Sequence, residues 1–215
     1  MKEAESNLTP ENEHYSSKIS TLAKRIVTYF LYLFIIVQVA FSSSRDDIIY
    51  YTESGYAEFT SRVPLHTFTG KSNDLTGMID PREGVVDFYL DLNTLETGIG
   101  KRDRDMFNTL EVDEYPFAEF TGTLNSSIDM ELTTRQDAVV TGEFTMHGVT
   151  REVTIQGTLQ KNEEGVFLEA EWILNLTHYN IKPPGILFYR VNEEQGIRIE
   201  ATLLPQNRET VLNYN

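Results

Sequence analysis

Residues 141–155 place the tightest limit on what this chain can fold into, because apolar and polar side chains alternate there on both sides of a turn. The apolar positions are Gly142, Phe144, Met146, Val153 and Ile155. A period of two is typical of strands that are buried on one face and wet on the other. The turn contains Gly148, which can take the positive φ of a tight hairpin. The segment therefore predicts two antiparallel strands joined by a short turn.

Six further segments alternate in the same way, and turn-forming residues separate them. They are 56–63, 85–92, 117–124, 128–132, 167–176 and 197–203. Together with the hairpin they predict about eight strands, at the spacing of an up-and-down barrel or a sandwich. One helix is predicted from near Gly100, with Met106 and Leu110 four residues apart on one face. Such a helix could cap one end of a barrel.

The N-terminal part of the chain differs in composition from the rest. Residues 1–25 form a polar leader, and residues 26–41 form an uncharged apolar run that follows a basic pair. With its small-residue end, the segment 26–44 is typical of a signal peptide, and an uncleaved signal-anchor is the alternative. A buried core helix or strand is the less favoured interpretation, because a run that is apolar on all sides is rare in soluble β domains.

The basic pair before the apolar run predicts the location of the folded body. Positive charge is retained in the cytoplasm, so the domain predicted over residues 48–205 would be periplasmic or otherwise extracytoplasmic. It would contact the inner membrane through residues 26–41 if that segment stays uncleaved. The last ten residues, 206–215, are expected to form a frayed tail.

Composition excludes several classes of function. The chain of 215 residues has a net charge of −15, and all but residues 1–45 carry 13 basic and 29 acidic side chains. Such a surface repels phosphate backbones, so we expect no nucleic-acid partner. The chain has no cysteine, which excludes disulfides, thiol nucleophiles and thiolate metal sites.

Three motifs resemble those of the YceI-like, polyisoprenoid-binding proteins. The hairpin Gly142–Val153 matches the pattern G-x-x-T-x-H-G-V-T-x-x-V, and Thr97–Met106 matches T-x-x-x-x-R-D-x-x-[LM]. Tyr115–Phe120 matches Y-P-x-x-x-F. Their order and spacing also agree with the family. The chain departs from the pattern at Arg104, where the family often has a histidine.

The resemblance implies an all-β fold, an extended lipocalin-like antiparallel barrel with a short capping helix. It also implies an exported, non-enzymatic protein that sequesters or carries a long-chain isoprenoid or a similar amphiphilic lipid. No cofactor is expected, although the bound molecule could be a quinone-type lipid. Members of the family are often dimers, so a homodimer is an expectation from the resemblance.

The inward faces of the strands are the main candidate binding surface, because they are apolar and carry no obvious charge. A barrel of about eight strands either fills its interior with side chains or holds one ligand, and pattern alone leaves both open. The resemblance favours a cavity. The candidate ligand-binding residues are Phe59, Val86, Phe88, Leu90, Arg102, Met106, Phe107, Phe120, Phe144, Met146, His147, Val153, Ile155, Trp172, Leu174, Tyr179 and Ile199.

Polar side chains near the predicted barrel rim suggest two further hypotheses. Arg102 could contact a diphosphate or a quinone carbonyl at the mouth, although a solvated helix face explains its cluster of charges equally simply. His147 could serve a barrel enzyme that acts on lipid, but a histidine in a turn is more often structural. His66, His147 and His178 match no metal-binding spacing, so no metal is expected. A membrane-tethered structural module with a filled core is the remaining alternative.

Overall fold

The structure is a computed structural model that describes residues 25, 27–29, 32, 48–63, 66–183, 185–186 and 189–212. The chain divides into two units, Met1–Asp47 and Ile48–Asn215. In the first unit the described residues, Arg25, Val27–Tyr29 and Tyr32, are helical and exposed. The rest of the predicted leader and export segment lies outside the described residues. No helix in the described part of the chain has the length and apolarity needed to span a membrane.

The described residues of the second unit form an antiparallel barrel closed in the order β1-β10-β7-β6-β5-β4-β3-β2. The strands are β1 (Ile48–Val63), β2 (His66–Asp80), β3 (Val85–Asp91), β4 (Phe117–Leu124), β5 (Gln136–Met146), β6 (Val149–Lys161), β7 (Val166–Asn175) and β10 (Glu194–Asn207). A small separate hairpin pairs β8 (Gly185–Ile186) with β9 (Tyr189–Arg190). The predicted all-β barrel of about eight strands is confirmed.

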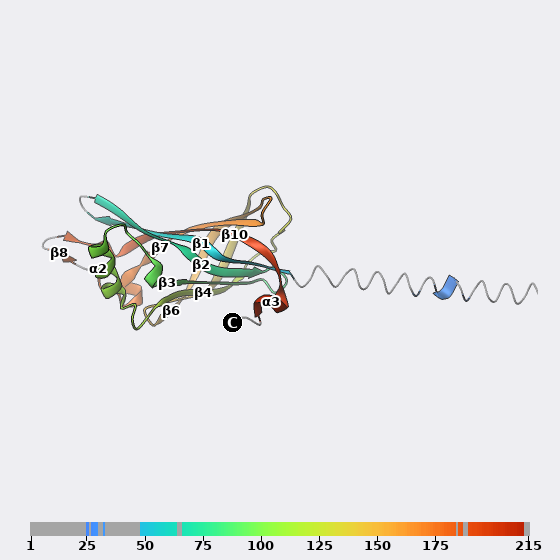
Figure 1. Cartoon of the computed structure of the whole chain (residues 1–215), viewed down its shortest axis with the longest axis horizontal. Helices are drawn as coiled ribbons and strands as arrows, with labels where there is room; N and C mark the ends of the chain where they lie inside the picture. The colour runs from blue at the N-terminus through green and yellow to red at the C-terminus, as the bar shows by residue number, and fades with distance from the viewer. Residues whose placement is uncertain are drawn as a thin grey trace, which may run out of the picture. The chain divides into compact units, whose positions relative to one another are not determined.

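Short helical elements lie at the two ends of the barrel (Figure 1). The helix α2 (Gly100–Leu110) lies with β8 at one end, which we call the mouth, and α3 (Arg208–Leu212) lies at the other, the far end. Two 3₁₀ turns, η1 (Leu92–Thr94) and η2 (Leu176–Tyr179), follow β3 and β7. The predicted helix near Gly100 is therefore present, and it covers the mouth.

The hairpin of β5 and β6 has the predicted geometry. Met146 pairs with Val149 across a two-residue turn. Both turn residues have positive φ, 53° at His147 and 68° at Gly148, as a hairpin that follows the strand twist requires. Phe144 and Ile155 are buried on the inner face of the barrel, so the alternation that predicted these strands is also the one that builds the core.

One strand prediction is wrong, and one strand was not predicted. Segment 128–132 is a turn, in which the amide of Leu132 donates to the carbonyl of Asp129 over 3.2 Å. The strand β2 was not predicted, because Gly70 and Gly77 interrupt its pattern. In both places a Cβ atom would overlap an aromatic ring of the neighbouring strand, Phe59 over Gly70 and Phe88 over Gly77. The glycines therefore make room for inward-facing rings, and they do not mark turns.

The C-terminal prediction is also wrong over residues 206–212. The strand β10 runs to Asn207 and α3 follows it directly. The Arg208 guanidinium lies 3.0 Å from the buried carboxylate of Asp80, and Val211 is buried. An ion pair and a buried side chain hold this segment against the far end, so only residues beyond 212 lie outside the described part.

Candidate functional site

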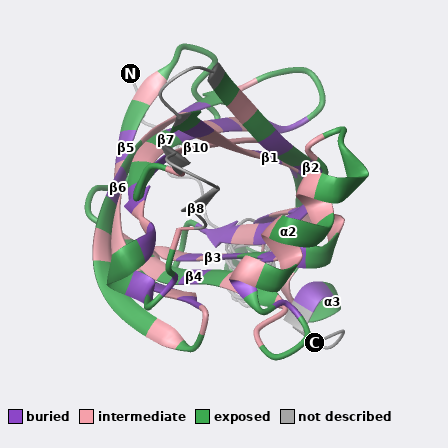
Figure 2. Ribbon diagram, turned by 90° about the vertical axis from the view of Figure 1, so that its left-hand side faces the viewer, coloured by how far each residue is buried: buried purple, intermediate pink, exposed green. Residues whose placement is uncertain are grey.

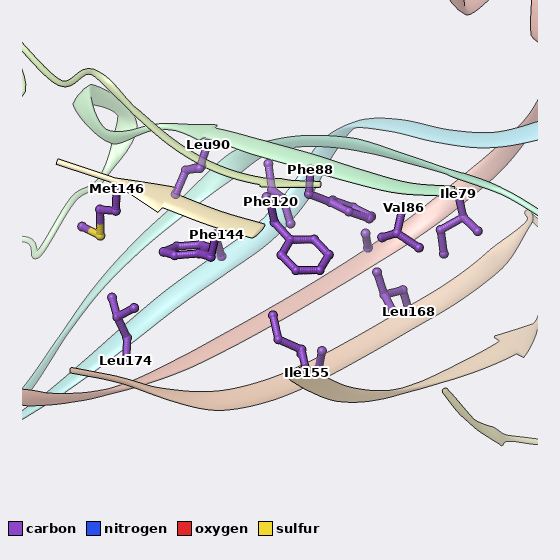
Figure 3. Close-up of a cluster of buried hydrophobic side chains, with 14 of the residues drawn as sticks. Ile79, Val86, Phe88, Leu90, Phe120, Phe144, Met146, Ile155, Leu168 and Leu174 are labelled. Atoms are coloured by element: carbon purple, nitrogen blue, oxygen red, sulfur yellow. The ribbon is translucent and has the colours of Figure 1, made fainter. Parts of the chain in front are cut away.

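A cavity of about 880 Å³ runs inside the barrel and beneath α2. That volume lies near the upper end of the usual range for ligand pockets, roughly 300–1,000 Å³. Its walls are almost entirely aliphatic and aromatic side chains from every barrel strand. Figure 3 shows such side chains reaching inward from opposite walls, with Phe88 and Phe120 on one side and Ile155 and Leu168 on the other. The interior is therefore hollow, and the filled-core alternative is wrong.

The hollow arises from an uneven distribution of side-chain size around the wall. On one side Phe120 pairs across strands with both Phe88 and Phe144, which makes a row of three rings over β3, β4 and β5. On the adjacent side Gly157 pairs with both Ala138 and Ala170, which makes a row of small residues over β5, β6 and β7. All six residues except Gly157 are buried, and all of them line the cavity. Small side chains on this part of the wall cannot fill the space that the rings leave.

Most of the candidate ligand-binding residues line this cavity. They are Phe59, Val86, Phe88, Leu90, Arg102, Met106, Phe120, Phe144, Met146, Ile155, Trp172, Leu174 and Ile199. They come from seven of the barrel strands and from α2. Strands far apart in the sequence thus supply one cavity wall that is mostly apolar, and Figure 2 shows the ring of these strands seen along the barrel.

The other four candidates lie outside the lining. Phe107 is partly buried and packs against the core from α2. Val153 and Tyr179 border a second, smaller hollow of about 410 Å³ between β6 and β7. Tyr179 is buried, with its ring 5.6 Å from that of Phe144, and burial raises the pKa of its hydroxyl. His147 lies on the rim, where its ring contacts groups of Tyr179, Glu111 and Tyr115.

Comparison with known proteins agrees with this geometry. The family model of the YceI-like domain matches residues 51–203. The chain belongs to the YceI-like domain family. A UPF0312 protein of Pseudomonas putida strain GB-1 is 33% identical over 115 residues. That match covers 49% of this chain and 56% of the relative, so the chain spans little more than half the length of the curated relatives it matches.

Solved structures share the YceI-like fold at low sequence identity. A polyisoprenoid binding domain from Saccharophagus degradans is 17% identical, with a TM-score of 0.59 over 74% of this chain and 98% of that domain. BcnA of Burkholderia cenocepacia is 16% identical, with a TM-score of 0.56 over 68% of this chain and 94% of that protein. Identities this low support the fold alone.

The YceI-like motif around Arg102 and Asp103 places the cap helix on the barrel. The Arg102 guanidinium lies over the ring of Phe68 on β2, 4.5 Å from its centroid, an arrangement in which cation and ring attract. The Asp103 carboxylate accepts hydrogen bonds from the amide and the hydroxyl of Thr97, at 2.8 and 2.5 Å. An acidic side chain is favourable in the first turn of a helix. Arg102 therefore holds α2 against the barrel wall, and Asp103 fixes the start of the helix.

His147 of the hairpin motif joins three segments at the rim. Its Nδ1 lies 3.1 Å from the carbonyl oxygen of Tyr179, and its Nε2 lies 3.0 Å from the carboxylate of Glu111 at the end of α2. Both partners are acceptors, so both contacts are hydrogen bonds only when both ring nitrogens carry hydrogen. The ring also lies 4.7 Å from that of Tyr115. This residue ties the hairpin turn to the cap helix and to η2.

Sequence reasoning missed two kinds of lining residue. Alternation places the small residues Ala57 and Ala170 on inner faces, but it indicates only which face is buried and not how much space is left, so neither they nor Ala138 became candidates. The polar residue Gln195 was missed because it lies just before the alternating segment 197–203, and Ser61 was not counted as a candidate because it is polar. Ser61 follows Ala57 and Phe59 at even spacing, and alternation places all three on one face.

The strands β6 and β7 separate towards the mouth. They pair only from Gly157 with Ala170 to Lys161 with Val166. The second hollow lies beside the unpaired parts, and Trp172 and Leu174 border both it and the main cavity. Strand pairing is therefore incomplete in this part of the barrel wall, and these two side chains lie between the two hollows. Among the described residues, no group of three metal-ligating side chains comes together here or elsewhere.

Proposed function

We propose that this YceI-like protein is a non-enzymatic carrier that encloses the hydrocarbon chain of a long isoprenoid or a similar lipid. The observation that carries the proposal is the cavity of about 880 Å³, whose walls are apolar over nearly their whole extent. Each CH₂ group moved from water into such a space contributes about 0.8 kcal/mol. A long chain can therefore bind tightly with few hydrogen bonds.

The related folds support the same class of ligand. The similar domain from Saccharophagus degradans is described as polyisoprenoid binding. A branched, unsaturated chain suits a cavity walled by aromatic rings on one side and by small residues on the other. The Phe144 ring meets both Trp172, at 6.3 Å, and Tyr179, at 5.6 Å, in edge-to-face contacts. These contacts hold the aromatic part of the wall in a fixed shape before any ligand enters.

A lipid-modifying enzyme on the same barrel is the weaker alternative. Its proposed base, His147, has an acidic neighbour in Glu111, but both ring nitrogens face protein acceptors and the residue does not line the cavity. An enzyme would need a reactive group at the chain that it encloses. A carrier needs no reactive group, so the carrier proposal explains the geometry without assigning a catalytic role to any residue.

Export and assembly stay predictions from the sequence. We propose an extracytoplasmic location, with residues 26–44 acting as the export signal and residues 26–41 as an anchor where no cleavage occurs. Fractionation of the native host, followed by N-terminal sequencing of the mature protein, distinguishes cleavage from anchoring. Sedimentation of the purified protein tests the homodimer that the family resemblance implies.

The carrier proposal is tested by extracting native protein. The full chain is purified from its own host under mild conditions and extracted with organic solvent, and the extract is analysed by mass spectrometry. We expect one class of long-chain lipid at near-stoichiometric amounts. Protein that is fully folded yet releases no lipid, and that does not bind an added fluorescent fatty-acid probe, would contradict the proposal.

A further inference from the structure

The cavity ends before it reaches the far end of the barrel. On β7 its lining runs from Leu168 to Leu174, whereas Val166, the first residue of that strand, is buried and lies outside the lining. On β10 the lining ends at Ile199, and Leu203, nearer the far end, is 0% exposed and lies outside it. The hollow therefore has a closed floor, and the part of the barrel beneath that floor is filled.

Four side chains form this floor. Ile79 pairs with Val86 across β2 and β3, and Leu159 pairs with Leu168 across β6 and β7. In the closed order of the barrel these two strand pairs face each other. All four residues are buried and all of them line the cavity. Figure 3 shows Ile79, Val86 and Leu168 at one end of the inward side chains, with Met146 at the other end.

Tyr50 crosses the barrel beneath the floor. It is the third residue of β1, pairs with Ile79, and is buried without lining the cavity. Burial raises the pKa of its hydroxyl, and Glu131 raises it further, whereas Lys161 lowers it. Lys161 ends β6, which β10 and β7 separate from β1 in the barrel wall. A side chain that starts on β1 and interacts with these charges points across the interior.

Other buried side chains fill the space around Tyr50. Val166 and Leu203 pair with each other across β7 and β10, and they are 1% and 0% exposed. Met130 is buried in the turn between β4 and β5, and a hydrogen bond from the last amide of β6 holds that turn in place. All of them belong to one core cluster. We call Tyr50, Met130, Val166 and Leu203 the plug.

A cavity with a closed floor limits the length of the chain that it can enclose. A carbon atom with its hydrogens takes up about the volume of a water molecule, roughly 30 Å³. The cavity of about 880 Å³ therefore holds on the order of 30 carbon atoms, or about six prenyl units. A longer chain has to leave its remaining units outside the barrel in water, where they gain nothing from burial.

We propose that the plug limits the enclosed hydrocarbon to about six prenyl units, and that Tyr50 is the residue that determines this length. The inference rests on the carrier function proposed above. The ring of Tyr50 is the largest side chain of the plug and the one that crosses the interior. Without it the cavity should extend towards the far end, whereas a larger side chain at the floor should make the cavity shorter.

The test offers the full chain a mixture of prenyl alcohols that share one head group and have between four and ten units. They are presented in phosphatidylcholine vesicles, because anionic lipid would repel the acidic protein. The protein is separated from the vesicles, and the bound alcohols are measured by mass spectrometry. A bilayer surrounds every unit with hydrocarbon, whereas the barrel surrounds only the units above its floor. We expect alcohols of up to six units to load within about threefold of one another, and those of eight or more at least about tenfold less.

Substitutions at the plug and at the floor should move the limit in opposite directions. Tyr50→Ala removes seven heavy atoms, more than the five carbons of one prenyl unit, so loading of the seven-unit alcohol should rise at least about fivefold. Tyr50→Leu should act in the same direction to a smaller extent, and it retains more of the packing if the alanine variant does not fold. Val86→Phe adds atoms to the empty space above the floor, so loading of the six-unit alcohol should fall at least about fivefold.

Ile49→Ala is the matched control. Ile49 precedes Tyr50 on β1 and is 1% exposed, but successive side chains of a strand point to opposite faces. Among the described residues it belongs neither to the cavity lining nor to the core cluster. This variant should melt at a lower temperature and keep the wild-type length limit. The same change of limit as in Tyr50→Ala would mean that lost stability, and not the plug, controls loading.

The outcomes separate this inference from the function on which it rests. If the ten-unit alcohol loads as well as the six-unit alcohol, or if folded Tyr50 variants keep the wild-type limit, the role of the plug is wrong and the carrier function stands. If no alcohol of any length loads and native protein releases no lipid, both proposals are wrong.

Discussion

The two ends of the barrel differ in how their inner polar groups are satisfied. At the far end, the buried carboxylate of Asp80 accepts hydrogen bonds from the amides of Arg82 and Glu83, at 3.0 and 3.2 Å, and pairs with Arg208. At the mouth, the Oγ of Ser61 has no partner among the described residues, and Arg102 contacts a ring in place of a carboxylate. A fully paired polar group stabilises the fold. The Arg102 guanidinium, by contrast, lines the cavity and is partly exposed.

This comparison predicts opposite effects of substitution at the two ends. Removing a charged group at the far end should cost stability and leave binding intact, whereas removing one at the mouth should weaken binding and leave stability intact. The predictions below test the far end, the wall between the two ends, the rim and the outer surface.

The largest effect is expected at the far end. Asp80→Ala removes two hydrogen bonds to backbone amides and leaves Arg208 without its main partner, so we expect a loss of about 3 kcal/mol in the free energy of unfolding. Urea denaturation measures it. The exposed turn residue Glu163 is the control, and Glu163→Ala should change stability by less than about 0.5 kcal/mol. If Asp80→Ala instead weakened lipid binding at full stability, the contrast between the two ends would be lost.

The next effect separates hollow wall from filled wall. Ala170 lines the cavity, whereas Ala201, also buried, lies outside the lining, where a Cβ on Gly55 would already be 3.2 Å from its methyl group. Ala201→Leu should therefore cost about 1–3 kcal/mol through overpacking. Ala170→Leu should cost less than about 1 kcal/mol, because its added atoms enter empty space, and it should reduce lipid capacity. Denaturation and probe binding measure the two. Equal losses of stability would mean that the cavity is not open in solution.

The same contrast explains how much of the fold could be predicted from the sequence. Alternation placed the hairpin of Phe144 and Ile155 correctly, because burial on one face leaves a local pattern. The strand β2 was missed because its glycines make room for aromatic rings of the neighbouring strands. The partner of Gly70, for example, is Phe59 on β1, and a local pattern in β2 does not show it. The strand predicted over 128–132 is wrong because a local apolar residue there has another cause. Met130 is buried in the core, but it lies in a turn and not in a strand.

The apolar character of the site could be predicted from the sequence, but the volume of its cavity could not. Inward aromatic and aliphatic residues follow from strand alternation, so residues such as Phe88 and Trp172 were found. The volume of the hollow depends on which residues pair across strands, as Ala138 and Ala170 do with Gly157. Such pairing depends on register, which a single sequence does not reveal. His147 was placed at the rim by its turn, but its partners lie 32 and 36 residues away in the chain.

The rim tests whether His147 belongs with the structural groups or with the binding groups. His147→Ala removes contacts to Glu111 and to the carbonyl of Tyr179, and it puts alanine at a positive φ. We expect a loss of about 1–2 kcal/mol in stability and little change in lipid affinity. His178→Ala, at an exposed position on η2, should change stability by less than about 0.5 kcal/mol. A His147→Ala protein of full stability that no longer bound lipid would move this residue to the binding group.

The smallest effect is expected on the outer surface, where Glu169 is paired but partly exposed. A hydrogen bond from Arg198, together with Arg135, lowers the pKa of the Glu169 carboxyl, and its side chain is 23% exposed. A lowered pKa in the folded state stabilises the protein above the pKa of an unfolded glutamate, about 4.3, and this contribution is lost as the pH falls through the lower folded value. Urea midpoints measured between pH 7 and pH 3 should therefore fall less steeply for Glu169→Gln than for the wild type. Because surface pairs contribute little, a steep difference here would mean that the outer charges, and not the far-end pair, hold the barrel closed.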